Sequence, residues 1–504
     1  MHTGLDRRTF LARAAVASGG LLSMGAVERL VARDALGNGR RTSAEPYGRL
    51  RRVADQRGVE VLALPVGFRY VTFGHIGSVM SDGNPTPLAL DGMGSFTGGR
   101  CHGLGKDHLV RLVRNSEDRN PAGTVGSVLG DRSAAYDPTA FGGTTTLVYD
   151  EHRRELVQDF VSLNGTTVNC AGGISYRGRF WLTGEETVAG PDAAAASARF
   201  AKRHGYLFET PVDRGPNELE VAVPIVDAGR FSHEAAAVDQ RTGIVYETED
   251  PGSGVGAGFY RYTPNDPDDL TAGGVLDMLA IAGQPQLDLR EGRTRGDALP
   301  VSWFRIDEPD PALARVSDPS STFNQGRAKG GAKFNRLEGC WEDDSTIFFV
   351  STSGGDVKNG DVNSDGYREG FGQVWAYRPG AGGGTLTLVF ESSSGSELDS
   401  PDNITVTPRG GLILCEDDAS SRYVDTHPLA PGIDDVNRLI GLTQDGEAFE
   451  FAVNVLNESE LAGACFSPSG RTLFVNIFGR STVIGDPIEG MTCAVTGPWR
   501  RGPL

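Results

Sequence analysis

A unit of turn residues followed by a short apolar run that ends in an acid or an amide recurs along this chain. The letters DQRTG precede IVYETED at residues 239–250, and SPSG precedes RTLFVN at residues 467–476. Turn residues beside runs rich in β-branched and aromatic side chains predict short strands joined by tight turns. The 69 glycines and 27 prolines are too many for long helices and follow no collagen period. In a chain of 504 residues, recurring strand modules of this kind favour a β-propeller over a sandwich.

We therefore expect an all-β chain in which residues 46–504 form a single β-propeller domain with short helical insertions. Residues 193–204 are predicted to be a short surface helix, and residues 277–288 a helical or irregular insertion. Residues 297–332 are polar and low in strand signals, so they are expected to be a long excursion between blades.

The N-terminal residues have the layout of an export signal. Arg7 and Arg8 precede an apolar segment rich in small residues, which is typical of a twin-arginine leader and leads us to assign residues 1–35 to it. Arg13 and the small residues make this segment too interrupted to span a membrane, and no later segment qualifies. We expect an extracellular, periplasmic or cell-wall-associated protein whose partner is the twin-arginine export machinery. This machinery moves folded proteins, which suits a chain that acquires a cofactor before export.

Charge and cysteine content narrow the function classes. The net charge of −18 argues against a nucleic-acid partner, because a phosphate backbone would be repelled. It is compatible with bound cations and equally with a merely acidic surface. The six cysteines are far apart and form no CxxC pair, which excludes a small disulfide scaffold and a zinc ribbon.

Acidic side chains recur where the predicted strands end. In a propeller the innermost strands line a central channel, so carboxylates at one end of several blades would meet near the axis. Like charges brought together raise one another's pKa or hold cations, and oxygen-rich clusters suit Ca²⁺ or another hard ion. Any one of these acids taken alone could equally be an exposed turn residue. They are Glu185, Glu186, Glu234, Glu249, Asp250, Glu338, Asp402, Glu416, Asp417 and Asp418.

The ordered succession of short motifs resembles the PhoX-type alkaline phosphatases and their close relatives, from about Leu64 to Trp499. The motifs are NCAGG, LTGEE, GRFSHEAA, TED, NRLEG, LDSPDNITVTPRGGLILCEDD, LAGACFSPSGRTLFVNI and AVTGPW. This resemblance implies a six-bladed propeller with an iron–calcium cluster on its axis. It also implies a phosphatase that releases inorganic phosphate from small phosphate esters.

The resemblance further implies roles for individual residues. Cys170 is implied to be an iron ligand, since a thiolate is soft and suits Fe³⁺ better than Ca²⁺. Arg336 matches the arginine that meets the substrate phosphate, a task for which a planar guanidinium is suited. Both are expected to be catalytic. The implied metal ligands are Cys170, Glu185, Glu186, Glu234, Glu338, Asp402 and Glu416.

Three positions depart from the family pattern. Many relatives have His-Asp-Gly-Met where this chain has Leu90-Asp91-Gly92-Met93, and Asn-His-Glu where it has Asn115-Ser116-Glu117. Gly184 stands where a cysteine often precedes the paired glutamates. The loss of two histidines suggests a divergent branch whose substrate could differ.

Residues 361–369, DVNSDGYRE, have the oxygen spacing of a calcium-binding loop. Position twelve of a full EF-hand loop would be Gly372 instead of glutamate, so the segment is not an EF-hand. Two interpretations remain open for it, a separate structural calcium site and a polar hairpin tip.

Three functions are compatible with these residues. The first is a phosphatase, expected to be a monomer; it needs no serine nucleophile, and the chain has no G-x-S-x-G elbow. The second is a calcium-dependent propeller hydrolase of the lactonase type, which would leave Cys170 and Arg336 without a task. The third is a non-catalytic, metal-binding propeller of the cell envelope.

Overall fold

The computed structural model describes residues 45–98, 108–119, 127–191, 200–417, 425–479 and 489–504. The predicted leader, residues 193–199 of the predicted helix, and Asp418 lie outside these ranges. Residues 200–204, the rest of that predicted helix, are not helical. Among the described residues, no helix has the length and apolar character needed to cross a membrane.

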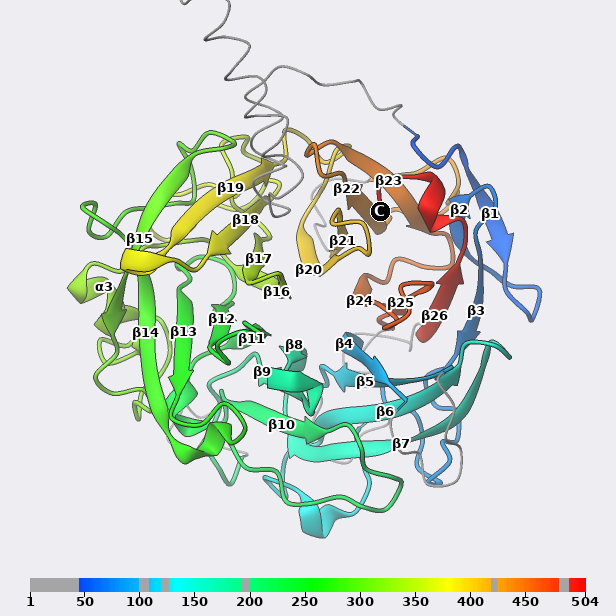
Figure 1. Cartoon of the computed structure of the whole chain (residues 1–504), viewed down its shortest axis with the longest axis horizontal. Coiled ribbons are helices and arrows are strands. Elements are labelled where there is room, and N and C mark those ends of the chain that lie inside the picture. Colours follow the sequence, from blue (N-terminus) through cyan, green and yellow to red (C-terminus); the bar gives the residue numbers. More distant parts are fainter. Residues whose placement is uncertain (1–44, 99–107, 120–126, 192–199, 418–424, 480–488) are drawn as a thin grey trace, which may run out of the picture.

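The strands fan out from a central axis, as expected for a β-propeller (Figure 1). Hydrogen bonds join them into five sheets within the described residues. Two of these sheets follow one another along the chain: β4 (Leu90–Thr97), β5 (Leu109–Ser116), β6 (Gly142–Asp150) and β7 (Glu155–Thr166), then β8 (Asn169–Ile174), β9 (Phe180–Glu185) and β10 (Leu207–Pro211).

The largest sheet has nine strands, because β15, the last strand of one group, pairs with β19, the last strand of the next group. Its first five strands are β11 (His233–Val238), β12 (Val245–Glu249), β13 (Phe259–Pro264), β14 (Gly274–Ile281) and β15 (Ala298–Arg305). The other four are β16 (Leu337–Asp343), β17 (Thr346–Ser351), β18 (Gln373–Arg378) and β19 (Thr385–Glu391). The all-β propeller prediction is confirmed, whereas the count of six blades stays a prediction.

Two predicted insertions are wrong in their first residues, which are strands, whereas residues 282–288 and 306–321 form no named strand. The stretch 277–288 begins within strand β14, which pairs with both β13 and β15. The stretch 297–332 holds β15 and the two-turn helix α3 (Thr322–Lys329). Pro300 weakens the strand signal of β15 (ALPVSWFR), because proline is unfavourable inside a strand. The remaining short helices are η1 (Arg132–Ala134), η2 (Tyr176–Gly178), η4 (Val226–Ala228), η5 (Leu270–Ala272), η6 (Ala381–Gly383) and η7 (Trp499–Arg501).

Strands from the two ends of the described chain close the ring. The C-terminal sheet consists of β24 (Leu461–Phe466), β25 (Thr472–Ile477) and β26 (Met491–Thr496), and its outer strand is the early strand β3 (Arg69–Phe73). A six-stranded sheet similarly adds β2 (Glu60–Pro65) and β1 (Leu50–Ala54) to β20 (Pro401–Val406), β21 (Leu412–Glu416), β22 (Arg438–Leu442) and β23 (Ala448–Asn454). Segments far apart in the sequence thus complete each other's sheets.

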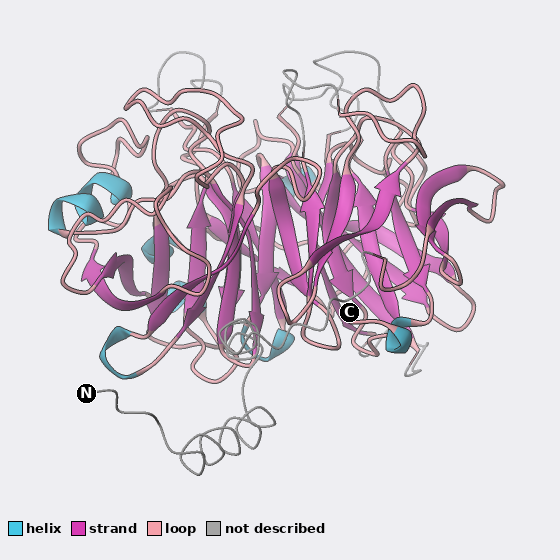
Figure 2. Ribbon diagram, turned by 90° about the horizontal axis from the view of Figure 1, so that it is seen from above, coloured by secondary structure: helices cyan, strands magenta, loops and turns pink. Residues whose placement is uncertain are grey.

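Apolar side chains fill the spaces between neighbouring sheets. In β17 every residue of TIFFVS is buried, since both faces of this strand are covered. Beside the ring closure, the rings of Phe68 and Trp499 lie 4.7 Å apart and those of Phe451 and Trp499 lie 5.1 Å apart. Burying one such side chain contributes about 1.5–3 kcal/mol. The strands run between two faces of the molecule, one with long connections and the other with short turns (Figure 2).

Six strands form the inner ring, and each contacts the next: β4, β8, β11, β16, β20 and β24, with β24 returning to β4. Small residues let these strands approach closely. A Cβ on Gly339 would lie 2.7 Å from the backbone oxygen of Asp402, and one on Gly463 would lie 2.5 Å from that of Asp91. Both separations are too short for a side chain, so glycine is required here.

Candidate metal centre

Five of the six inner strands carry an acid or a thiol at their second residue. These residues are Asp91 in β4, Cys170 in β8, Glu234 in β11, Glu338 in β16 and Asp402 in β20. The equivalent residue of β24 is Ala462. The ring places equivalent residues of its strands at the same height along the axis. These five side chains therefore lie at one end of the axis, although they are widely separated in the sequence.

A shift in strand register surrounds each of these positions. In β11, His233 pairs with Glu249 and the next paired residue is Ala236, so Glu234 lies in a bulge. The same shift occurs in β4, β8, β16 and β20, and in β24 it begins one residue later, at Ala462. A bulge bends the strand and re-aims a side chain, which explains how a residue near the end of a flat strand can face the axis.

A left-handed backbone residue directly precedes four of the inner strands. Ala89, Val168, Arg336 and Ser400 have φ values of 53°, 50°, 43° and 44°. This region is unfavourable for side chains with a Cβ, and above all for the β-branched Val168. Its recurrence at one structural position shows a shared turn that introduces each ligand-bearing bulge, and strain of this kind is typical of functional sites.

A second set of acids comes from the neighbouring strands. Glu117, Glu186 and Asp417 directly follow β5, β9 and β21, which are the second strands of their sheets. Glu460 directly precedes β24. These residues therefore lie at the same end of the ring as the bulged residues.

Together the two sets form four overlapping groups of potential metal ligands. Within each group, one ligand atom per residue lies within 4.8 Å of the others. Cys170, Glu234 and Asp402 each belong to two groups, so the four groups form one continuous cluster. The groups are Asp91, Glu117 and Cys170; Cys170, Glu186 and Glu234; Glu234, Glu338 and Asp402; and Asp402, Asp417 and Glu460.

The environment of the Glu234 carboxylate indicates that this cluster is suited to a bound cation. Its side chain is 1% exposed, and both carboxylate oxygens are buried without a hydrogen-bond partner in the described part of the chain. Burial, followed by the nearby Asp402 carboxylate, raises the pKa of Glu234 well above its usual value. A buried, unpaired carboxylate is costly, and a cation would provide the missing partner.

The neighbouring groups share this electrostatic situation. Burial and the Glu117 carboxylate raise the pKa values of both Asp91 and Cys170. Burial raises the pKa of Glu186 to about 7, although Arg119, which is ion-paired with Glu117 and Glu186, opposes this shift. Because a cation would reverse these shifts, the cluster is suited to one or more metal ions, with a single soft sulfur among hard oxygens.

Arg336 lies at the edge of the cluster and is held by two acids. Its Nε and Nη2 donate to Oδ2 of Asp250 at 3.1 and 2.9 Å, and Nη2 lies 2.9 Å from Oε1 of Glu338. Burial disfavours the charged guanidinium, but Asp250 and then Glu338 raise the pKa of Arg336 above its usual value. The side chain remains 29% exposed, so it presents a fixed positive charge beside the ligand groups and toward solvent.

Glu185 and Glu416, two of the expected ligands, do not join the cluster. Glu185 accepts hydrogen bonds from the Thr167 and Gly205 amides and lies 2.6 Å from Nδ1 of His204. Glu416 pairs with Arg438, whose Nε and Nη2 lie 2.7 and 2.6 Å from its two oxygens. Each is the last residue of a second strand, so its side chain points away from the axis while that of the next residue points toward it.

The other expected site residues are brought together. Cys170, Glu186, Glu234, Glu338 and Asp402 all belong to the cluster, and Arg336 contacts Glu338. Asp91, Glu117 and Glu460 were not expected as potential ligands, and Asp417 was expected only as one of the acids near the axis. A signal for the first was present, because Asp91-Gly92, Cys170-Ala171, Glu234-Ala235 and Glu338-Gly339 share one pattern, a potential ligand followed by a small residue.

The two positions that lack the family histidines have structural contacts. Ser116 donates to the backbone oxygen of Leu88, and Leu90 is fully buried. Asn115, next to Ser116 in β5, donates from Nδ2 to the backbone oxygens of Cys170 and Ala171 at 2.8 Å each. Asn115 thereby fixes the backbone that carries the thiol.

The contacts of residues 361–369 favour the interpretation as a hairpin tip over that as a calcium site. Val362 and Arg368 form an antiparallel bridge across the turn. Asp365 forms ion pairs with Arg290 and Lys333, and these two cations hold its pKa far below the usual range. A carboxylate neutralised in this way is a poor calcium ligand.

The chain is similar to a known family and to several solved structures. The family model described as alkaline phosphatase PhoX matches residues 46–479. A search of curated proteins found no match. Among solved structures, PhoX of Pseudomonas fluorescens in complex with vanadate, a transition state analogue, is similar with a TM-score of 0.63 and 17% identity, covering 91% of this chain and 99% of that one. A gluconolactonase of Xanthomonas campestris has a TM-score of 0.34 and 13% identity, covering 82% and 97% of the two chains.

Proposed function

Because the chain belongs to the alkaline phosphatase PhoX family and is therefore a phosphatase, we propose that it hydrolyses phosphate esters at the cluster around Cys170 and Glu234. The family is metal-dependent. The observation that carries the proposal is the pair of buried, unpartnered carboxylate oxygens of Glu234 beside the thiol of Cys170. A site of this kind needs positive charge to be stable, and a phosphoryl group needs positive charge to react.

The donor set supports two kinds of ion. Cys170 with Glu186 and Glu234 combines one sulfur and carboxylate oxygens, which suits Fe³⁺. Asp402, Asp417 and Glu460 offer oxygens alone, which suits Ca²⁺. Such ions, when bound, neutralise phosphoryl oxygens and stabilise the charge that develops during in-line displacement.

Arg336 is proposed to bind the phosphoryl group of the substrate. Asp250 fixes its Nε and Nη2, while Nη1 has no hydrogen-bond partner among the described residues. The two N–H groups of Nη1 are thus left for phosphate oxygens, and the orientation of the guanidinium is set before the substrate arrives. Pairing with Asp250 and Glu338 keeps this arginine charged at every working pH.

Export is the second part of the proposal. The paired arginines Arg7 and Arg8 before an apolar segment support passage through the twin-arginine machinery. This route carries folded proteins, so the metal ions would be acquired before export. The enzyme would then release inorganic phosphate from esters outside the cytoplasm.

Metal analysis combined with a phosphatase assay tests the proposal. Full-length protein, purified after export, should contain iron and calcium and should hydrolyse a chromogenic phosphomonoester until a calcium chelator is added. Cys170→Ala should lose iron and at least about 99% of turnover, since it removes the single sulfur ligand. Cys493→Ala, at a buried cysteine in β26 away from the cluster, is the matched control and should retain both.

Two results would contradict the proposal. One is full iron content and turnover in the Cys170→Ala variant, which would remove the thiol from the centre. The other is ester hydrolysis that survives complete removal of metal from folded protein, as judged by circular dichroism.

A further inference from the structure

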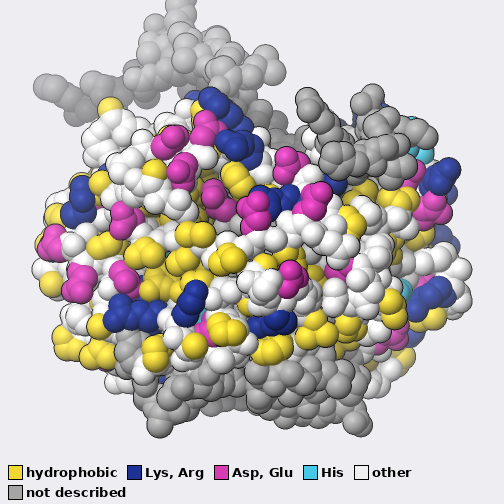
Figure 3. All heavy atoms as spheres, turned by 90° about the horizontal axis from the view of Figure 1, so that it is seen from below, with side chains coloured by type: hydrophobic (Ala, Val, Ile, Leu, Met, Phe, Trp, Pro, Cys, Tyr) yellow, Lys and Arg dark blue, Asp and Glu magenta, His cyan; other side chains and the backbone are white. Residues whose placement is uncertain are grey.

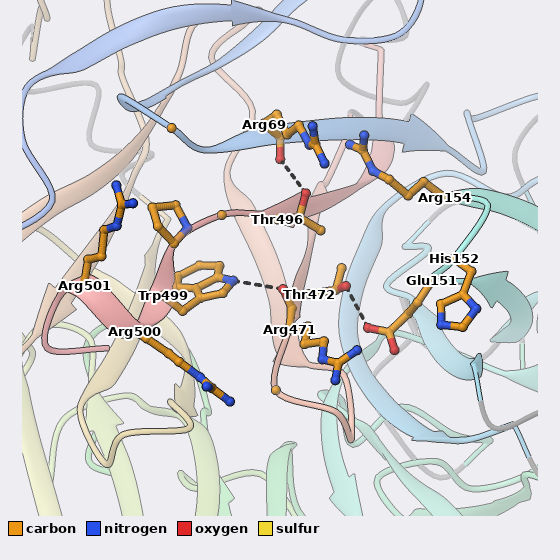
Figure 4. A pocket seen from close by; sticks show the side chains of 14 residues that line it. Arg69, Glu151, His152, Arg154, Arg471, Thr472, Thr496, Trp499, Arg500 and Arg501 are labelled. Carbon is orange, nitrogen blue, oxygen red and sulfur yellow. Dashed lines mark hydrogen bonds between the residues drawn. The ribbon is translucent and has the colours of Figure 1, made fainter.

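A pocket of about 1040 Å³ lies beside the turn between β24 and β25, and Figure 4 shows the side chains that line it. Glu460 precedes β24 at the metal centre, whereas Gly470 and Arg471, on the turn after β24, line this pocket. The six residues of β24 at about 3.3 Å each separate the two places by about 20 Å. The pocket therefore belongs to a different site.

Among the described residues, five arginines and no lysine line this pocket. They come from three distant stretches of the chain: Arg69 in β3, Arg154 in the β6–β7 turn, and Arg471, Arg500 and Arg501 near the C-terminus. We call them the arginine ring. None of the five forms an ion pair with an acid in the described part of the chain. The single acid of the lining is Glu151, whose Oε1 accepts hydrogen bonds from the hydroxyls of Thr472 and Ser469 at 2.8 and 3.0 Å.

This concentration of positive charge contrasts with the rest of the protein. The chain has 66 acidic and 48 basic residues, and the wall of the ring seen in Figure 3 carries both signs intermixed. Many surface arginines are ion-paired, as Arg261 is with Asp277. Five neighbouring guanidiniums without counter-charges repel one another, and an anion bound among them would remove this repulsion.

The backbone that carries the arginine ring is held in place. Nε1 of Trp499 donates to the backbone oxygen of Arg471 at 3.0 Å, and the hydroxyl of Thr496 donates to that of Arg69 at 3.5 Å. Trp499 is 6% exposed and packs against Phe68 and Phe451. The charges thus project from a rigid frame, which lowers the entropy cost of binding.

We infer that the arginine ring binds an unbranched chain of phosphate groups. The planar guanidinium engages two phosphate oxygens at once, so an all-arginine lining favours phosphate. A pocket of this volume exceeds what one phosphate group fills, and five charges match several phosphates bound together. Because the guanidiniums surround a hollow, a flexible chain can reach them better than the flat surface of a membrane.

The test measures binding of a fluorescent linear polyphosphate to the full-length, metal-loaded protein by anisotropy at several salt concentrations. Substituting Arg69, Arg471 and Arg500 by Gln together should weaken binding at least about tenfold at physiological salt. The slope of log Kd against log salt concentration should fall by about 2 to 3, because binding with fewer phosphate contacts releases fewer counterions. The charge-matched control is Arg177→Gln, Arg305→Gln and Arg368→Gln, three exposed arginines that do not line the pocket; it should bind within about twofold of the parent.

Hydrolysis of a small chromogenic phosphomonoester should be unchanged in both triple variants, which shows that the fold and the metal centre are intact. Equal loss of polyphosphate binding in the two triple variants would attribute binding to total charge and overturn the inference. Unchanged binding in the pocket variant would do the same, by assigning the polymer to the metal centre. Pocket-dependent binding to anionic lipid vesicles, without binding to polyphosphate, would replace the inference with a membrane contact.

Discussion

Adjacent acids at the end of a strand have different tasks in this protein. Glu186 belongs to the metal cluster, whereas Glu185 lies 2.6 Å from His204 in the space behind it. The same division separates Asp250, which holds Arg336, from Glu249, which accepts a hydrogen bond from the hydroxyl of Tyr260 at 2.7 Å. Side chains alternate along an extended backbone, so one acid of each pair serves the site and the other stabilises its own blade.

At Arg336 we predict that geometry matters as well as charge. Arg336→Lys keeps the positive charge but cannot bind Asp250 through two nitrogens while also meeting a phosphate. We expect kcat/KM for a phosphomonoester to fall by a factor of about 100 to 1000, with metal content unchanged. The control is Arg261→Lys, at an arginine that binds Asp277 through Nε and Nη2 on an outer strand. Equal kinetics in the two lysine variants would refute a substrate-binding role.

His204 should make stability depend on pH. Burial lowers its pKa, but Glu185 and Asp137 outweigh burial and raise the pKa to about 9. Because the pKa is higher in the folded than in the unfolded chain, the stabilisation is fully present below about pH 6.5 and is lost as the pH rises through 9. The free energy of unfolding should therefore drop by on the order of 3 kcal/mol between pH 6 and pH 10 from this group.

Denaturant unfolding at pH 6 and pH 10 measures this effect, with His204→Gln as the comparison. The variant should be less stable than the parent at pH 6, and the difference should shrink at pH 10. A difference that stays constant with pH would show that His204 is not protonated in the folded protein.

At the level of the element, the inner strand is built to present one ligand. A left-handed residue, a bulge and a small residue follow one another, as in Arg336, Glu338 and Gly339 of β16. The left-handed turn sets the entry of the strand, the bulge aims the ligand, and the small residue lets the next strand approach. Ligand position thus depends on backbone features that lie beside the ligand.

We predict that Gly339→Ala disrupts the centre without touching a ligand. The added Cβ would lie 2.7 Å from the backbone oxygen of Asp402 and 2.8 Å from Cα of Asn403, and backbone cannot move aside cheaply. Forcing β16 and β20 apart should cost about 1–3 kcal/mol and separate Glu338 from Asp402, with loss of bound metal. Gly380→Ala is the control, since its Cβ would meet no atom closer than 3.7 Å. Normal metal content in Gly339→Ala would contradict this account of strand packing.

The recurring unit of turn and apolar run predicts second strands such as β12 and β25, but it predicts neither the inner strands nor which side chains reach the axis. Acids at strand ends could be recognised, but Glu185 and Glu416 were expected beside Glu186 because alternation can only be applied once the strand boundary is known to one residue. Glu460 and Glu117 could not be recognised, since nothing local distinguishes them from solvated turn acids. Glu460 and Glu117 join the cluster only because the ring places β24 and β5 beside neighbouring strands.

In the molecule as a whole, the ring brings together residues that lie far apart in the sequence. Asp91 and Glu460 contribute to one continuous cluster although 369 positions separate their residue numbers, 460 − 91. The propeller itself could be predicted, because many short strands with tight turns leave few other architectures for this length. The pairing of β15 with β19 could not, because Pro300 is unfavourable inside a strand and weakens the strand signal of residues 298–305. The arginine ring likewise forms only when β3 joins β26.

Anomalous X-ray scattering from crystals of the metal-loaded protein, collected on both sides of the iron absorption edge, would locate the metal ions. We expect an iron peak at ligand distance from the sulfur of Cys170 and a carboxylate oxygen of Glu234, on the axis of the ring. Further ions should lie toward Asp402 and Glu460. An axis without metal in active crystals, or iron bound only away from Cys170, would contradict this prediction.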